Sequence, residues 1–119
     1  MTSESFTGEN WIDVGTAEDV PSRGARVVET PYGDVALFKT ADGTLFALRD
    51  RCPHKGGPLS QGIVHGHFVT CPLHNWVIGL RTGEAAGADQ GCTPTIPLRF
   101  EGERVLILLD VLAPSRRAA

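Results

Sequence analysis

Four potential metal ligands occur as two short pairs, and this arrangement limits what the chain can fold into more than any other feature. Cys52 and His54 lie in the segment CPHKGGPL, and Cys71 and His74 lie in the segment CPLHNW. The spacing is C-x-H, then residues 55–70, then C-x-x-H. If the two pairs act together, the fold has to bring two separate loops to one place.

Three interpretations of these four residues are open from their types and spacing. The first is that they are ordinary residues, with the cysteines buried as small hydrophobic side chains and the histidines exposed. The second is a structural zinc site, although zinc fingers usually pair cysteine with cysteine in one loop. The third is a [2Fe–2S] cluster in which two histidines replace two cysteines on one iron. The mixed pair in each loop favours the cluster, because each loop then supplies one ligand to each iron.

The composition is that of one small domain. The chain has 119 residues, of which 41% are hydrophobic, and 14 acidic against 11 basic residues give a net charge of -3. Nucleic-acid binding needs clustered lysine and arginine, so we expect none. The most apolar run, residues 105–109, is too short to span a membrane, and the polar N-terminus lacks the pattern of a signal peptide. We therefore expect a cytoplasmic protein with one domain over residues 8–112 and a polar tail over residues 113–119.

Short apolar runs between turn signals predict an all-β fold. We expect one helical turn at residues 17–20, and strands over residues 11–14, 25–29, 34–40, 44–49, 62–64, 67–70, 76–80, 96–100 and 104–109. Asp42-Gly43 is the strongest hairpin turn signal. Both Cys/His pairs then lie on loops at strand ends, where binding residues are commonly placed by a rigid sheet.

Three stretches resemble Rieske-type ferredoxin domains, namely CPHKGGPL, TCPLHNW and GCTPTIPLRFEGERVLIL. The resemblance extends over residues 11–109. It implies a β-sandwich with a smaller cluster-binding subdomain and one [2Fe–2S] cluster per chain. It also implies that two cysteines bind one iron and two histidines bind the other; these ligands are Cys52, Cys71, His54 and His74. A third, proline-bearing loop usually covers the cluster, and residues 90–94 match it best.

Other residues of the three loops have expected roles around the cluster. The residues that we expect there are Lys55, Gly56, Gly57, Pro72, Leu73, Asn75, Trp76 and Pro94. We expect the glycines to let the first loop fold tightly and Trp76 to pack in the core or shield the cluster. His65 and His67 flank a turn and are expected to be exposed. Cys92 is expected to be a buried thiol of the covering loop.

Two features of the ligand loops predict a low reduction potential. Rieske proteins of respiratory cytochrome bc complexes carry an additional cysteine in each loop, joined as a disulfide, where this chain has Gly57 and Leu73. High-potential members also place hydroxyl groups where this chain has Trp76 and Ile78. Hydrogen bonds to the cluster sulfurs stabilise the reduced state. Without them we expect a potential of roughly −150 mV rather than one near +300 mV.

The chain has no catalytic constellation of its own and no nucleotide fingerprint, so by itself we expect an electron carrier that is not catalytic alone. The segment HGHFVTCPLHNWVIGLRTGEA resembles the small subunit of NAD(P)H-dependent assimilatory nitrite reductase. That resemblance implies a large partner subunit with FAD, a [4Fe–4S] cluster and sirohaem, which reduces nitrite to ammonia.

The alternative is a ferredoxin of an aromatic-ring-hydroxylating dioxygenase. Its partners would be a ferredoxin reductase and the oxygenase component. Dioxygenase ferredoxins more often have glycine directly after the second ligand histidine, where this chain has Asn75. This difference favours the nitrite reductase subunit.

Overall fold

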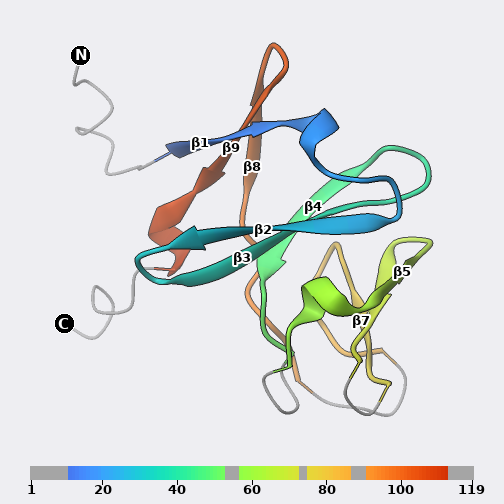
Figure 1. The fold of residues 1–119 in the computed structure, drawn as a ribbon. Helices are drawn as coiled ribbons and strands as arrows, with labels where there is room; N and C mark the ends of the chain where they lie inside the picture. The colour runs from blue at the N-terminus through green and yellow to red at the C-terminus, as the bar shows by residue number, and fades with distance from the viewer. Residues whose placement is uncertain (1–10, 53–56, 73–74, 87–90, 113–119) are drawn as a thin grey trace, which may run out of the picture.

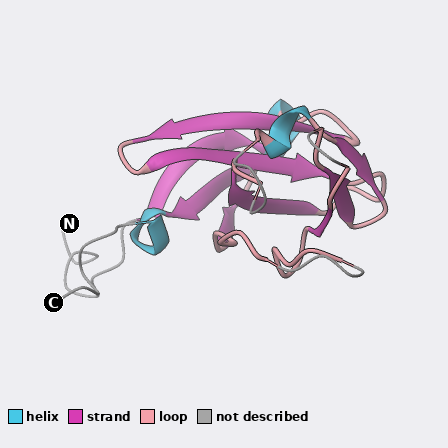
Figure 2. Ribbon diagram, turned by 90° about the horizontal axis from the view of Figure 1, so that it is seen from below, coloured by secondary structure: helices cyan, strands magenta, loops and turns pink. Residues whose placement is uncertain are grey.

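A computed structural model describes residues 11–52, 57–72, 75–86 and 91–112. In these ranges the chain is built almost entirely from strands, and Figure 2 shows that helix is limited to short turns. In chain order the elements are β1 (Trp11–Thr16), η1 (Ala17–Asp19), β2 (Gly24–Thr30), β3 (Gly33–Lys39), β4 (Leu45–Arg49), η2 (Leu59–Gln61), β5 (Ile63–His65), β6 (Phe68–Thr70), β7 (Val77–Gly79), β8 (Leu98–Glu101), β9 (Arg104–Leu108) and η3 (Leu109–Leu112). The predicted all-β fold class is confirmed.

The strands form three antiparallel sheets of three strands each, in the orders β1-β9-β8, β2-β3-β4 and β5-β6-β7. Figure 1 shows β5 and β7 on the opposite side of the molecule from β1 and β9, with β2 and β3 between them. We call the β5-β6-β7 sheet together with η2 the small lobe. Among the described residues, no helix is long and apolar enough to cross a membrane.

The strand β3 separates two hydrophobic cores. Its residues Val35 and Leu37 point to one side, whereas Ala36 and Phe38 point to the other, as the alternation of a β-strand requires. The sandwich core consists of Val14, Val20, Val35, Leu37, Ala47, Ile96, Val105, Ile107 and Leu109. The cysteine core consists of Ala36, Phe38, Leu48, Cys52, Leu59, Val64, Val69, Cys71, Ile78 and Leu80. We call the β1-β9-β8 and β2-β3-β4 sheets together the sandwich. Because β3 is covered on both faces, it joins the sandwich to the small lobe.

The described turns agree with the sequence at several points and differ at others. The Asp42-Gly43 turn is confirmed, and Gly43 has a φ of 88°. The predicted helical turn is confirmed as η1, at whose start the Thr16 N–H donates to Asp19 Oδ2 over 2.9 Å. The predicted turn at residues 65–66 is wrong by one position: β5 continues through His65, which pairs with Phe68.

The strand predicted over residues 96–100 begins only at Leu98. Ile96 instead donates its N–H to the Ala47 carbonyl over 2.8 Å, so this stretch belongs to the edge of β4 before the chain turns into β8. The helical turns η2 and η3 are absent from the sequence prediction. Residues 8–10 and the predicted tail 113–119 lie outside the described residues.

Candidate functional site

Two of the predicted ligands, Cys52 and Cys71, lie in the same packed cluster of apolar side chains. Cys52 follows β4 of the central sheet, and Cys71 follows β6 of the small lobe. Their exposed fractions are 1% and 0%. Neither cysteine is in a disulfide. The fold therefore brings the thiol-bearing residues of two separate loops into one hydrophobic environment.

The two cysteine loops are closed in the same way. The Cys52 N–H donates to the Gly57 carbonyl over 2.8 Å, and the Cys71 N–H donates to the Trp76 carbonyl over 2.7 Å. Gly57 is buried, and Trp76 is half-buried against the cysteine core, as expected for a packing residue. Each closing bond fixes the backbone of one cysteine, so both residues are held before any group binds.

A third segment, residues 91–94, forms hydrogen bonds both with the chain after β7 of the small lobe and with β4. The Thr93 N–H donates to the Gly83 carbonyl over 2.8 Å, and the Pro94 carbonyl accepts from the Arg49 N–H over 3.0 Å. Gly83 has a φ of +77°, and a Cβ added there would lie 2.2 Å from the Thr93 oxygen. Only glycine allows this approach. The segment that contains the predicted covering proline is therefore fastened beside the end of β4, and Cys52 follows that strand.

The prediction that Cys92 is buried is wrong, because the structure places this cysteine at the surface. Cys92 forms an isolated antiparallel bridge with Glu84. Its neighbour Thr93 takes the inward position and is only 4% exposed. Successive residues of an extended chain point to opposite sides, so the buried threonine places the cysteine outside.

The prediction that both surface histidines are exposed holds for His65 and is wrong for His67. His67 is half-buried, with its Nε2 atom 3.1 Å from Asp42 Oδ2 and its ring in a T-shaped contact with Phe46 at a centroid distance of 5.2 Å. Hydrogen bonds from Thr40 and then from His67 hold the pKa of Asp42 well below its usual range. This contact joins the β3–β4 turn to the small lobe, and no sequence pattern indicated it.

The structure describes only part of the predicted site. Within the described ranges lie Cys52, Gly57, Cys71, Pro72, Asn75, Trp76 and Pro94. Outside them lie His54, Lys55, Gly56, Leu73 and His74. The ligand role of the two histidines therefore stays a prediction, as does the placement of the other three residues around the cluster.

The described half of the site fits a group that needs two thiolates. The two cysteines share one apolar cluster, whose side chains carry no ionised group. No described buried side-chain nitrogen or oxygen lacks a hydrogen-bond partner. A thiolate-bound iron–sulfur cluster suits this environment, since its potential depends on burial and on hydrogen bonds to sulfur. When bound, such a cluster supplies one-electron redox chemistry, and the surrounding side chains exclude water from the thiols.

Comparison with known proteins agrees with this chemistry. Residues 10–97 match the family model of the Rieske [2Fe-2S] domain. The chain is 34% identical over 109 residues to the ferredoxin component of the 2,4-dinitrotoluene dioxygenase system of Burkholderia sp. (strain RASC), an alignment that covers 86% of this chain and 98% of the relative. It is 45% identical over 89 residues to the 3-phenylpropionate/cinnamic acid dioxygenase ferredoxin subunit of Photorhabdus laumondii, covering 72% of this chain and 77% of the relative.

The fold is also that of a solved structure from Mycobacterium tuberculosis, described as an NADH-dependent nitrite reductase small subunit. The TM-score is 0.75 at 22% identity, and the match covers 84% of this chain and 95% of that chain. At this identity the likeness concerns the fold alone. The family match spans most of the chain, and the buried cysteine pair suits the cluster of that family. The chain belongs to the Rieske [2Fe-2S] domain family and carries one [2Fe–2S] cluster as a one-electron carrier.

Proposed function

We propose that the chain is the ferredoxin component of a multicomponent oxygenase and carries single electrons from a reductase to the oxygenase component. One observation carries this proposal: a dioxygenase ferredoxin component aligns with 86% of this chain and with 98% of its own length, at 34% identity. Almost the whole of the relative thus aligns with this chain. The nitrite reductase small subunit, by comparison, shares the fold at 22% identity.

The conformation of Asn75 weakens the sequence argument for nitrite reductase. Asn75 occupies the position at which dioxygenase ferredoxins more often have glycine. Asn75 has a φ of 58°, which lies in the left-handed region. Glycine adopts this region freely, and asparagine is among the few other residues that tolerate it. The two residues therefore serve the same backbone turn, and the difference between them does not separate the two classes of partner.

In the proposed site, the thiolates of Cys52 and Cys71 hold one iron, and the imidazoles of His54 and His74 hold the other. The burial of both cysteines in one core supports the first half of this assignment. The C-x-H and C-x-x-H spacing supports the second half. The cysteine core keeps water from the thiolate side, and the loop-closing bonds hold both cysteines in position as the cluster changes charge.

The small subunit of nitrite reductase is the second candidate. The likeness of the fold to a structure so described favours it, as does the resemblance of the segment around Asn75-Trp76. In that case the partner is the large subunit that the resemblance implies, with FAD, a [4Fe–4S] cluster and sirohaem. The electron carrier itself is the same in both candidates, so the partner decides between them.

Reconstitution tests the proposal. The purified holoprotein is reduced with NADH through a ferredoxin reductase and then mixed with either an oxygenase component and its aromatic substrate or a sirohaem nitrite reductase large subunit. Stopped-flow absorbance follows the reoxidation of the cluster. We expect reoxidation by the oxygenase in the presence of oxygen and none by the nitrite reductase subunit. Stable complex formation with the sirohaem subunit, with nitrite-dependent reoxidation, would reverse the choice.

A further inference from the structure

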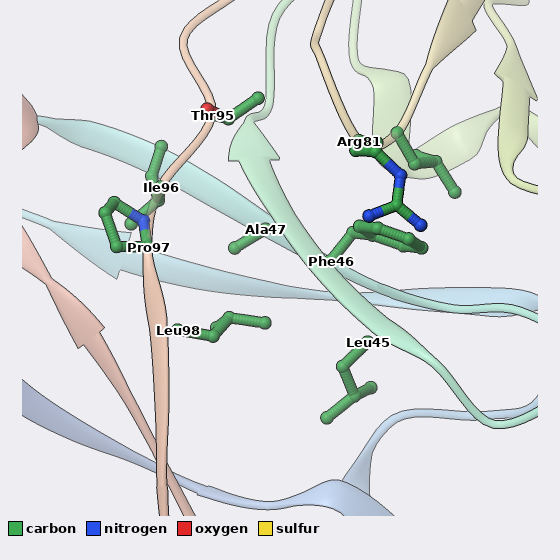
Figure 3. Close-up of a pocket in the computed structure, with 9 residues that line it drawn as sticks. Leu45, Phe46, Ala47, Arg81, Thr95, Ile96, Pro97 and Leu98 are labelled. Atoms are coloured by element: carbon green, nitrogen blue, oxygen red, sulfur yellow. The ribbon is translucent and has the colours of Figure 1, made fainter.

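A groove lined by apolar side chains and by polar backbone and side-chain groups lies where the small lobe meets the β2-β3-β4 and β1-β9-β8 sheets. Its volume is about 280 Å³, and Figure 3 shows it between β4, the chain after β7 and the segment that leads into β8. The residues that line it are Leu45, Phe46, Ala47, Leu80, Arg81, Thr95, Ile96, Pro97 and Leu98. Leu80 also belongs to the cysteine core. Anything that binds in the groove therefore lies beside the part of the protein that holds the two cysteines.

One wall of the groove is the outer edge of a sheet. The strand β4 is the last strand in the order β2-β3-β4. Part of its outer edge is covered, because Ile96 donates to the Ala47 carbonyl over 2.8 Å and Arg49 donates to the Pro94 carbonyl over 3.0 Å. Pro97 has no N–H and ends this ladder.

The uncovered part of the edge is Leu45, the first residue of β4. Backbone groups two residues apart point to the same side of a strand, so Leu45 presents its N–H and carbonyl on the same edge as Ala47. No β-bridge joins this side of Leu45 to another described residue. Edges of this kind accept an added strand from another chain.

Arg81, which has no carboxylate partner among the described residues, lies at the mouth of the groove. The Arg81 Cζ atom lies 5.7 Å from the centre of the Phe46 ring, and Figure 3 shows the guanidinium over that ring. Phe46 also makes a T-shaped contact with the half-buried His67. No carboxylate within the described ranges forms an ion pair with Arg81.

Arg99 offers a direct comparison elsewhere on the surface. Its Cζ atom lies 5.5 Å from the centre of the Trp11 ring, so it also stacks on an aromatic side chain. In contrast to Arg81, it has a carboxylate partner, with its Nε atom 3.3 Å from Glu101 Oε2. A stacked guanidinium is oriented before it binds, which reduces the entropy that a bidentate contact costs. Arg81 is thus positioned for a carboxylate that the described chain does not supply.

We propose that the groove binds an extended segment of a protein partner, which pairs with the edge of β4 at Leu45. An apolar side chain of the segment packs against Leu45 and Leu98, and an aspartate or glutamate of the segment binds Arg81. The open sheet edge favours a peptide over a small organic acid, since a small acid uses the charge and the apolar walls but not the backbone groups. The proposed function enters only in naming the partner, which is then the oxygenase component or the reductase.

The test uses peptides and the isotope-labelled holoprotein. Overlapping 12-residue peptides cover the surfaces of the oxygenase component, the reductase and a sirohaem nitrite reductase subunit. Binding is followed by backbone amide shifts in NMR spectra. We expect a peptide with Asp or Glu beside a bulky apolar residue to shift the amides of Leu45, Ala47 and Leu98. We expect the substitution Arg81→Gln to raise the dissociation constant of that peptide about tenfold, which corresponds to about 1.4 kcal/mol of binding free energy.

Matched controls separate the contributions. Arg99→Gln also removes an arginine stacked on an aromatic ring and leaves binding unchanged. Replacing the acidic residue of the peptide by its amide weakens binding to the wild-type protein. The same replacement causes little further loss of affinity for the Arg81→Gln protein, as expected when the two groups form a direct ion pair. Methylation of the peptide nitrogen that pairs with β4 abolishes binding, and methylation one residue away does not.

Two outcomes would contradict the proposal that the groove binds a partner segment. Both are distinguishable from a failure of the proposed function. If no peptide shifts the groove amides, or if Arg81→Gln and Arg99→Gln behave alike, the groove is not a partner site, even when electron transfer to the oxygenase proceeds. If the binding peptide comes from the sirohaem subunit, the groove is a partner site as proposed, but the proposed role as an oxygenase ferredoxin is wrong.

Discussion

At the scale of single residues, the cysteines divide clearly by their surroundings. Cys52 and Cys71 are buried together, whereas Cys92 is exposed on a separate segment. The sequence identified the first two because each accompanies a histidine. It did not identify the exposure of the third, since cysteine is among the most buried residue types and only the inward turn of Thr93 decides the matter.

This division predicts the effect of removing each thiol. We expect Cys52→Ser and Cys71→Ser each to abolish the iron and acid-labile sulfide content and the visible absorption of the purified protein. Cys92→Ser should retain all three, because its side chain lies at the surface. Metal and sulfide analysis with optical spectra provides the measurement. Full cluster content in either of the first two variants would refute the thiolate assignment, and zinc in place of iron and sulfide would refute the cluster.

The Asp42 carboxylate predicts an acid-dependent contribution to stability. Hydrogen bonds from Thr40 and His67 lower its pKa in the folded protein from 3.8. A lowered pKa stabilises the fold above the unfolded value, and this stabilisation disappears as the pH falls through the folded value. We therefore expect Asp42→Asn to lower the free energy of unfolding at pH 6, with the difference from wild type shrinking below about pH 4.

Denaturant unfolding followed by tryptophan fluorescence at several pH values measures this difference. Asp34→Asn is the matched control, because Asp34 is an exposed aspartate of the neighbouring strand β3. Asp34→Asn shows what the loss of an exposed aspartate charge does by itself, and the two variants are compared at each pH. A difference for Asp42→Asn that is constant from pH 6 down to about pH 3 would show that the charge of Asp42 does not act through the folded state.

At the scale of elements, the sequence predicted the strands better than their partners. Short apolar runs and turn signals located β3 and β4, because the Asp42-Gly43 turn is local. The division into two cores was not predictable in the same way: Val35 to Phe38 are apolar on both faces of β3, and a pattern without alternation does not say which side faces which sheet. The start of β8 at Leu98 was also missed, since the Ile96 N–H is bonded to the carbonyl of Ala47, a residue distant in sequence.

The close contact between Gly83 and the segment of residues 91–94 predicts that Gly83 is sensitive to substitution. We expect Gly83→Ala to destabilise the protein and to disturb the segment at Thr93, because its Cβ would lie 2.2 Å from the Thr93 oxygen. Gly43→Ala is the control: Gly43 has a φ of +88°, but a Cβ there meets nothing within 4 Å. The control isolates the left-handed strain, which costs about 1–2 kcal/mol. Urea unfolding and the optical spectrum give the two readouts, and equal effects of the two variants would show that the close approach is unimportant.

At the scale of the whole molecule, the chain is a carrier whose potential and partner define its use. The position at which high-potential relatives place the second hydroxyl group holds Ile78, which is 0% exposed in the cysteine core. The other position holds Trp76, which packs against the same core. Neither side chain carries a hydroxyl donor. The sequence alone was sufficient for this conclusion, because the two positions are counted from the second ligand histidine.

The missing hydroxyls predict a potential of roughly −150 mV, at the low end of the Rieske range. Redox titration of the holoprotein, followed by the optical or electron paramagnetic resonance spectrum, measures it. A potential above zero would contradict the expectation and would point to hydrogen-bond donors to the cluster from residues other than Trp76 and Ile78. The same titration on Cys92→Ser is a control, and its potential should equal that of the wild type.

The two closing hydrogen bonds have a consequence for engineering. The motifs C-x-H and C-x-x-H differ in length, yet the bonds from Cys52 to Gly57 and from Cys71 to Trp76 enclose inserts of equal length, residues 53–56 and 72–75. The histidine is the second residue of one insert and the third residue of the other. Because the two anchor bonds span inserts of equal length, we expect a variant that moves the histidine by one position within its insert to keep both anchor bonds, which amide hydrogen exchange at Cys52 and Cys71 would measure.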